Sequence, residues 1–173
     1  AAAAFILRRQ PPGARAACLS GALLFLALAI ASLWASVVLK WISAPVTTAE
    51  AALVGLVLSM FKSGVVQSAN VVGVPAEHSL IVMTACSSAE GVARALVGLA
   101  AVLALLGAEF RRSLVPAAVA LAICYVGLNL ARLTIMASSW DLYALGHGPV
   151  GAALFDMVTT AALFAIALVS GRR

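Results

Sequence analysis

The chain has 173 residues, of which 64% are hydrophobic and 10% are charged, and its formal net charge is +5. Because an average soluble domain has roughly 25% charged residues, this composition excludes a soluble globular protein and predicts one integral membrane domain over 1–173. The basic residues lie beside apolar runs, as they do in cytoplasmic loops of membrane proteins. No basic helix with interleaved aromatic residues occurs, so nucleic acid is not an expected partner.

Long apolar runs predict an all-α fold, a polytopic transmembrane helical bundle. A bilayer core of roughly 30 Å requires about 20 apolar residues from a helix. Four segments meet this requirement, and the remaining chain leaves room for a fifth or sixth. A basic segment, 1–17, precedes the first span and is expected in the cytoplasm. The predicted spans are 18–39, 89–108, 114–137 and 150–170.

The stretch between the first two predicted spans is less regular. Residues 47–62 are apolar enough to enter a membrane, but this run is short. The glycines and Pro75 that follow interrupt helices, while the valines around them favour extended chain. We therefore expect an extended hairpin or re-entrant segment at 63–85 on the outer face, where its backbone is not exposed to lipid. Either 47–62 stays on the outer side, or it crosses the membrane and 63–85 crosses back.

Three arginine clusters predict the orientation, because cytoplasmic loops are enriched in Lys and Arg. If all three are cytoplasmic, both termini lie inside. Cys86, Arg132 and His147, which come from separate segments, then lie near the outer face, His147 in an outer loop. The clusters are Arg8, Arg9 and Arg15; Arg111 and Arg112; and Arg172 and Arg173.

Cys86 differs from the other two cysteines in its setting. Cys18 and Cys124 lie in apolar segments and are interpreted as small apolar side chains. Cys86 stands where extended chain meets a helix, and the positive end of a helix dipole favours a thiolate. Ser87 and Ser88 can cap the same helix. We interpret Cys86 as the candidate nucleophile.

Arg132 and His147 are the candidate partners of Cys86. A guanidinium in an apolar helix requires a polar partner or a wet cavity, unless it snorkels to the interface. Asn129 lies three residues earlier on the same helical face. By itself, His147 is interpreted as a solvated loop histidine. If its ring met the Cys86 side chain, it would activate the Cys86 thiol as a nucleophile. His78 is interpreted as a solvated loop residue.

The remaining charges in the predicted spans have simple interpretations. Glu90 and Arg94 are four residues apart and can neutralise each other. Asp156 lies beyond His147 in the last predicted span. It can orient Arg132 or His147, or pair with Arg94.

Three short motifs, GVPAEHSLIVMTACSS, NLAR and HGPVGAALF, together resemble the exosortase/archaeosortase family of membrane cysteine transpeptidases. The resemblance covers about 72–155. Ser88 stands where the family pattern has Gly, and the chain lacks several N-terminal spans of typical members. The matching positions are Ala85, Cys86 and Ser87, then Asn129 and Arg132, then His147, Gly151 and Phe155.

This resemblance implies cleavage of a C-terminal sorting signal of secreted proteins at the outer face of the cytoplasmic membrane. Cys86 would attack the scissile carbonyl, His147 would act as general base and acid, and Arg132, oriented by Asn129, would hold the oxyanion. Ser87 and Gly151 would support the site. No metal or organic cofactor is required.

The implied partners all belong to the membrane. They are the C-terminal helix of the substrate, membrane lipid and other membrane subunits. The substrate helix would pack against a face of small residues, Gly91, Ala95 and Gly98.

Two other functions fit the sequence. The chain can be a catalytically inactive exosortase-like subunit that binds partner helices. It can also be a small bundle that binds a cofactor through His78 and His147, although no two histidines share a helix face. A rhomboid-like serine protease is excluded because no G-x-S-x-G-like motif occurs.

Overall fold

The computed structural model describes residues 39–105 and 110–171, together with isolated positions between 21 and 37. The predicted segment 1–17 and nearly all of the predicted span 18–39 therefore lie outside the described residues. The described helices are α3 (Leu39–Ser59), α4 (Ser88–Leu105), α5 (Phe110–Ser138), α6 (Trp140–His147) and α7 (Pro149–Gly171). Between α3 and α4 lie β1 (Val66–Ser68), β2 (Val71–Val74), β3 (His78–Ile81) and a 3-10 turn, η2 (Thr84–Cys86).

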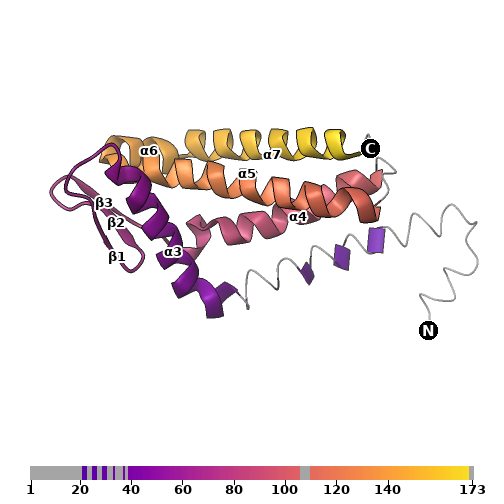
Figure 1. The fold of residues 1–173 in the computed structure, drawn as a ribbon, viewed down its shortest axis with the longest axis horizontal. Coiled ribbons are helices and arrows are strands. Elements are labelled where there is room, and N and C mark those ends of the chain that lie inside the picture. Colours follow the sequence, from indigo (N-terminus) through magenta and orange to yellow (C-terminus); the bar gives the residue numbers. More distant parts are fainter. Residues whose placement is uncertain are drawn as a thin grey trace, which may run out of the picture.

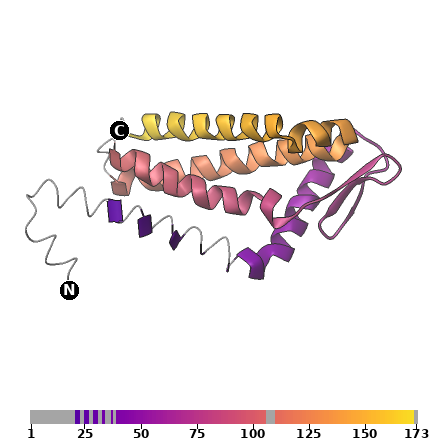
Figure 2. The same cartoon turned by 180° about the vertical axis from the view of Figure 1, so that it is seen from behind.

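Helices α4, α5 and α7 lie side by side along the long axis of the molecule, and α3 crosses them at a steep angle (Figures 1 and 2). Among the described residues, three helices are long and apolar enough to cross a membrane: Lys40–Ser59, Leu114–Ser138 and Pro149–Gly171. The last two confirm that the predicted spans 114–137 and 150–170 form such helices. The predicted span 89–108 forms α4, which has 18 residues and is not among the three.

The first of these helices overlaps the run 47–62, which the sequence indicated to be apolar enough to enter a membrane but short. Helix α3 is longer, because it begins at Leu39 and ends at Ser59. Pro45 lies inside α3 instead of ending it. The hydroxyls of Ser43 and Thr47 donate to backbone carbonyls in this stretch, and such side-chain bonds help a proline-containing helix in a membrane to satisfy its backbone.

The extended chain expected at 63–85 is present, and it forms an antiparallel sheet in the order β1-β2-β3. The fold is therefore a helical bundle with a small sheet, and not purely all-α. Val72 pairs with Leu80 across β2 and β3, and both side chains are buried against α3. Gly73 has φ +154°, and a Cβ there would lie 2.3 Å from the carbonyl oxygen of His78, so the close pairing requires glycine.

The bundle has two different ends. At the first, which we call the sheet end, the sheet and α6 lie beside the last residues of α5 and the first residues of α7 (Figure 1), and η2 follows the sheet and packs against α3. At the second, the far end, α4 finishes, α5 begins and α7 finishes. Cys86, Arg132 and His147 all belong to elements that meet at the sheet end.

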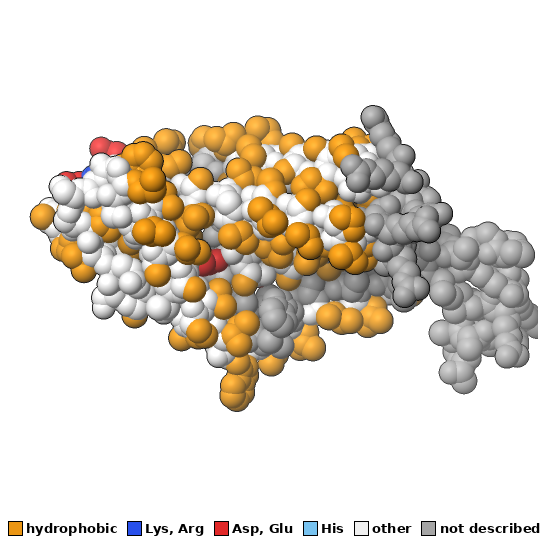
Figure 3. All heavy atoms as spheres, viewed as in Figure 1, with side chains coloured by type: hydrophobic (Ala, Val, Ile, Leu, Met, Phe, Trp, Pro, Cys, Tyr) orange, Lys and Arg blue, Asp and Glu red, His pale blue; other side chains and the backbone are white. Residues whose placement is uncertain are grey.

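Apolar side chains cover the bundle surface between the two ends (Figure 3). The exposed residues include Ile123 on α5 and Met157 on α7, which are 69% and 62% exposed. Inside the bundle, one apolar cluster fills the sheet end and a second fills the far end. Apolar residues on both sides of a helix are expected where the outer side contacts lipid.

Candidate functional site

Cys86 ends the short turn that joins the sheet to α4. Its backbone N–H donates to the carbonyl of Met83 over 2.9 Å, and the N–H of Ser87 donates to Thr84 over 3.1 Å. Helix α4 begins at Ser88, so Cys86 lies at the predicted boundary between extended chain and helix. The Cys86 side chain is half-buried and packs against the apolar cluster of the sheet end.

Asn129 holds the backbone of Cys86. Its Nδ2 donates to the Cys86 carbonyl oxygen over 3.0 Å, and its side chain is buried. The sequence predicted that Asn129 would orient Arg132, but its bond goes to the candidate nucleophile. Arg132 lies three residues later on the same helix, about one turn from Asn129.

Arg132 has the polar partner that an intramembrane guanidinium requires. Its Nε and Nη2 both donate to the carbonyl oxygen of Gly146, each over 3.2 Å. Its Cζ lies 4.9 Å from the centroid of the Phe155 ring, within the range of a cation–π contact. Gly146 belongs to the last turn of α6, where the helix dipole also favours a cation.

His147 is the last residue of the short helix α6, which forms in the connection between α5 and α7 that was predicted as a loop; the outer side of the membrane stays a prediction for it. The hydroxyl of Ser139 accepts the N–H of Leu142 and Asp141 stands in the first turn, which together start α6. His147 is exposed, and its ring stacks on Tyr143 with centroids 5.1 Å apart. Among the described side chains, no hydrogen bond joins the His147 imidazole to the Cys86 thiol.

Gly151 allows α7 to begin directly against the end of α6. A Cβ at this position would lie 2.2 Å from the carbonyl oxygen of Leu145 and 2.8 Å from Cα of Gly146. Both contacts are with backbone, which cannot rotate away. This close approach brings α7 under Arg132, so that Phe155, one turn later, can contact the guanidinium.

Sequence reasoning missed Glu50. This carboxylate on α3 accepts both the backbone N–H of Ser88, over 2.8 Å, and the Ser88 hydroxyl. Glu50 thereby accepts a hydrogen bond from a backbone N–H in the first turn of α4, a group that has no acceptor within the helix. This turn begins two residues after Cys86. Ser87 contributes as predicted, because its hydroxyl accepts the N–H of Ala89 over 3.2 Å. The available signal was a lone carboxylate in an apolar run, which usually has a specific partner.

The other carboxylate oxygen of Glu50 is unpaired among the described residues. This atom, Oε2, is buried and accepts no hydrogen bond from them. The Ser88 hydroxyl, at the position where the family pattern has Gly, is engaged by the other oxygen of the same carboxylate.

The small residues of α4, predicted as a docking face for a substrate helix, also contact the chain's own helices, and their use by a substrate stays a prediction. A Cβ at Gly91 would lie 2.0 Å from the hydroxyl of Tyr125, and one at Gly98 would lie 3.1 Å from Leu163. Ala95 packs against the apolar cluster of the far end. These residues let α4 approach α5 and α7 closely.

His78 is not a solvated loop residue. It lies in β3, with its ring centroid 5.7 Å from that of Trp140 and 5.5 Å from that of Tyr143. Its Nε2 is buried and has no hydrogen-bond partner in the described part of the chain. Tyr143 therefore contacts both histidines, because it also stacks on His147.

The charges predicted to pair on α4 do so. Arg94 Nη2 lies 3.5 Å from Glu90 Oε1. Asp156 lines a cleft together with Arg94, and among the described residues it forms no ion pair with Arg94, Arg132 or His147.

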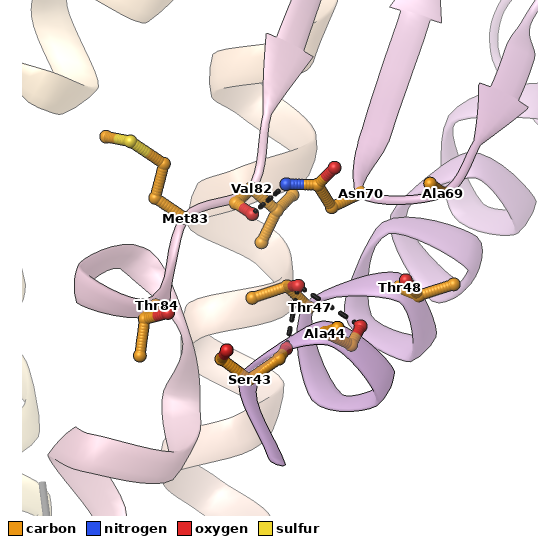
Figure 4. Close-up of a pocket in the computed structure, with 9 residues that line it drawn as sticks. All are labelled: Ser43, Ala44, Thr47, Thr48, Ala69, Asn70, Val82, Met83 and Thr84. Atoms are coloured by element: carbon orange, nitrogen blue, oxygen red, sulfur yellow. Dashed lines mark hydrogen bonds between the residues drawn. The ribbon is translucent and has the colours of Figure 1, made fainter. Parts of the chain in front are cut away.

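A cavity of about 480 Å³ lies beside the chain that leads into η2 (Figure 4). One wall is the first half of α3, where the Thr47 hydroxyl bonds back to its own helix. The other wall is extended chain, where Nδ2 of Asn70 donates to the carbonyl of Val82 over 3.0 Å. The lining is uncharged: Ser43, Ala44, Thr47, Thr48, Ala69, Asn70, Val82, Met83 and Thr84.

Within the described residues, no group of three or more His, Cys, Asp or Glu side chains could hold a metal ion. Comparison of the chain with protein-family models, with curated proteins and with solved structures finds no match.

Proposed function

We propose that this protein is a membrane cysteine transpeptidase or protease that resembles the exosortase/archaeosortase family. It would cleave C-terminal sorting signals of secreted proteins and transfer them to an acceptor. One observation carries the proposal: residues of all three motifs are joined by direct contacts at the sheet end. Asn129 bonds to Cys86, Arg132 bonds to Gly146 beside His147, and Phe155 lies under Arg132.

In the proposed reaction the Cys86 thiolate attacks the scissile carbonyl carbon. A carbon–sulfur bond forms, the peptide carbon–nitrogen bond breaks, and an acyl-enzyme thioester remains. Arg132 stabilises the negative charge on the carbonyl oxygen. An amine or hydroxyl of the acceptor, or water, then attacks the thioester and releases the Cys86 thiol.

His147 takes the proton from Cys86 and later gives it to the leaving amine. To do so directly, its ring must leave its stacked position on Tyr143. An exposed residue at the end of a short helix can change its side-chain rotamer on a nanosecond scale. Contacts of catalytic groups often become close only when substrate binds.

The proposed setting is the outer side of the cytoplasmic membrane, with both termini in the cytoplasm. Arg111 and Arg112 belong to α5 near the far end, and such clusters favour the cytoplasm. Because α3 is long and apolar enough to cross a membrane, the proposal keeps two routes to an outer Cys86: α3 stays on the outer side, or it crosses and 63–85 crosses back. The proposed partners are the C-terminal helix of the substrate, membrane lipid and other membrane subunits.

A catalytically inactive subunit is the second candidate. The observation that favours it is the packing of the Cys86 side chain against an apolar cluster, without a bonded base among the described residues. In this role the residues at the sheet end would only stabilise the fold and bind partner helices.

One experiment separates the two functions. C-terminal processing of signal-bearing secreted proteins is followed in cells that express the wild type, Cys86→Ala or Cys124→Ala. Cys124 is the matched control, because it is also a half-buried free thiol. The proposal expects processing to be lost only with Cys86→Ala. Unchanged processing by a stably inserted Cys86→Ala protein would support the inactive subunit instead.

A further inference from the structure

Two oppositely charged side chains line one cleft on the side of the bundle without pairing with each other. The cleft, of about 410 Å³, lies between α4, α5 and α7 and is lined in part by Arg94, Tyr125 and Asp156. The Arg94 side chain is 69% exposed, and its described ion pair, with Glu90, spans 3.5 Å. Asp156 is exposed and has no ion pair in the described part of the chain.

Both charges lie well inside apolar helices. Arg94 and Asp156 each follow the first residue of their helix, Ser88 or Pro149, by about two turns. Exposed charges at such a depth are unfavourable in lipid and normally have partners. The predicted span 18–39 contains no charged residue, so this segment cannot supply one.

The positions of the two charges fit a two-fold dimer. In a dimer whose two-fold axis runs parallel to the bundle, each residue lies at the same distance from the sheet end in both copies. Arg94 of one copy then lies at the depth of Asp156 of the other, and the reverse contact forms at the same time. Such a reciprocal arrangement is the defining property of an isologous interface.

The surface of α7 beside Asp156 can supply the packing. Met157 and Phe164 are 62% and 49% exposed, and the small residues Ala153 and Thr160, three and four positions from Asp156, are exposed on the same side of the helix. Small residues allow helices to approach closely in a membrane. We propose that this surface binds a second copy of the chain, with Arg94 of each copy paired with Asp156 of the other.

The test uses two single variants, Arg94→Asp and Asp156→Arg, each with its own affinity tag and fluorophore. Dimerisation is measured by energy transfer in lipid vesicles. Each variant alone would bring like charges together, so we expect its dimer affinity to fall about tenfold or more. Mixed together, the two variants place opposite charges at both contacts, so a heterodimer of near wild-type affinity is expected.

An ion pair within one chain cannot produce this rescue, because each variant alone lacks it. A monomeric wild type, single variants that dimerise normally, or a mixture that does not associate would each overturn the proposal. Monodisperse elution and thermal unfolding confirm that the variants are folded. If the charge reversals do not fold, Arg94→Gln and Asp156→Asn must still weaken the dimer. The readout needs no activity and is independent of the proposed function.

Discussion

The two ends of the bundle are stabilised in different ways. At the far end, the described core consists of apolar side chains alone, Leu99, Leu103, Ala117, Leu121 and Ala167. At the sheet end, a similar apolar cluster is accompanied by polar contacts that join separate elements. These contacts are Glu50 with Ser88, Asn129 with Cys86, Arg132 with Gly146, and Lys62 with Glu77 and Ser138.

This difference separates the structural part of the molecule from the candidate site. Apolar packing is sufficient to hold helices together, and it tolerates small shifts in position. Buried polar groups must be paired with good geometry, so they fix the positions of the groups around them. The following variants test this difference, beginning with the largest expected effect.

Substitution of Gly151 by alanine should destabilise the protein by about 3 kcal/mol, because the new Cβ would collide with fixed backbone. Gly98→Ala at the α4–α7 contact should have a smaller effect, since the contacted atom is the flexible end of Leu163. Gly127→Ala, which has open space around it, is the control without a collision and should be neutral or slightly stabilising, because alanine favours a helix interior more than glycine. Denaturant titration in micelles gives the three free energies of unfolding. Equal losses for Gly151→Ala and Gly98→Ala would contradict the account.

Replacement of Glu50 by alanine should cost about 2 kcal/mol, because the N–H and hydroxyl of Ser88 lose their acceptor. The matched control is Glu90→Ala, which removes a partly exposed ion pair and should cost under about 1 kcal/mol. Glu50→Gln, which retains an acceptor, should fall between the two. The same unfolding assay measures all three, and a Glu50→Ala protein as stable as Glu90→Ala would show that this contact is unimportant.

Asn129→Leu should cost about 1.5 kcal/mol, because the Cys86 carbonyl loses its donor. It should also increase the rate at which maleimide modifies Cys86, since the turn is no longer fixed. This rate is measured with Cys18 and Cys124 replaced by alanine. Asn70→Leu is the control, because it removes a similar bond to Val82, and it should not change the rate. Equal maleimide rates for Asn129→Leu and Asn70→Leu would contradict the proposal that Asn129 fixes the turn at Cys86.

The smallest effect is expected for Lys62→Met. The ion pair with Glu77 is partly exposed and the second contact is with the last turn of α5, so the loss should be under about 1 kcal/mol. The difference in melting temperature from the wild type should shrink as salt rises. A difference that persists in high salt would mean that Lys62 acts mainly through buried contacts.

Local patterns predicted much of the fold. Apolar runs indicated α5 and α7, and the valines and glycines near Gly73 indicated the extended chain that became the sheet. The start of α3 was not predicted, because the stretch around Pro45 contains polar residues whose hydroxyl bonds to the helix backbone are visible only in the structure. Helix α6 was missed because its start depends on the Ser139 cap more than on apolar periodicity.

For the candidate site too, the sequence predicted local features but not contacts between distant segments. The residue types of the site, with Cys86 in a turn and Arg132 on a later helix, could be selected from the sequence. Their contacts could not, because a hydrogen bond such as that from Asn129 to Cys86 depends on how two distant segments pack. Glu50 was missed for this reason, since its partner Ser88 is 38 positions later in the chain.

The most direct test of the central claim is to look for the acyl-enzyme. Purified protein is incubated with a signal-bearing substrate, and peptides containing Cys86 are analysed by mass spectrometry. The account predicts a hydroxylamine-sensitive thioester on Cys86 that is absent from the Cys86→Ala protein and strongly reduced in His147→Ala, because His147 takes the proton from Cys86 and gives it to the leaving amine during acylation. Cleavage of the substrate without any adduct on Cys86, or by the Cys86→Ala protein, would contradict it.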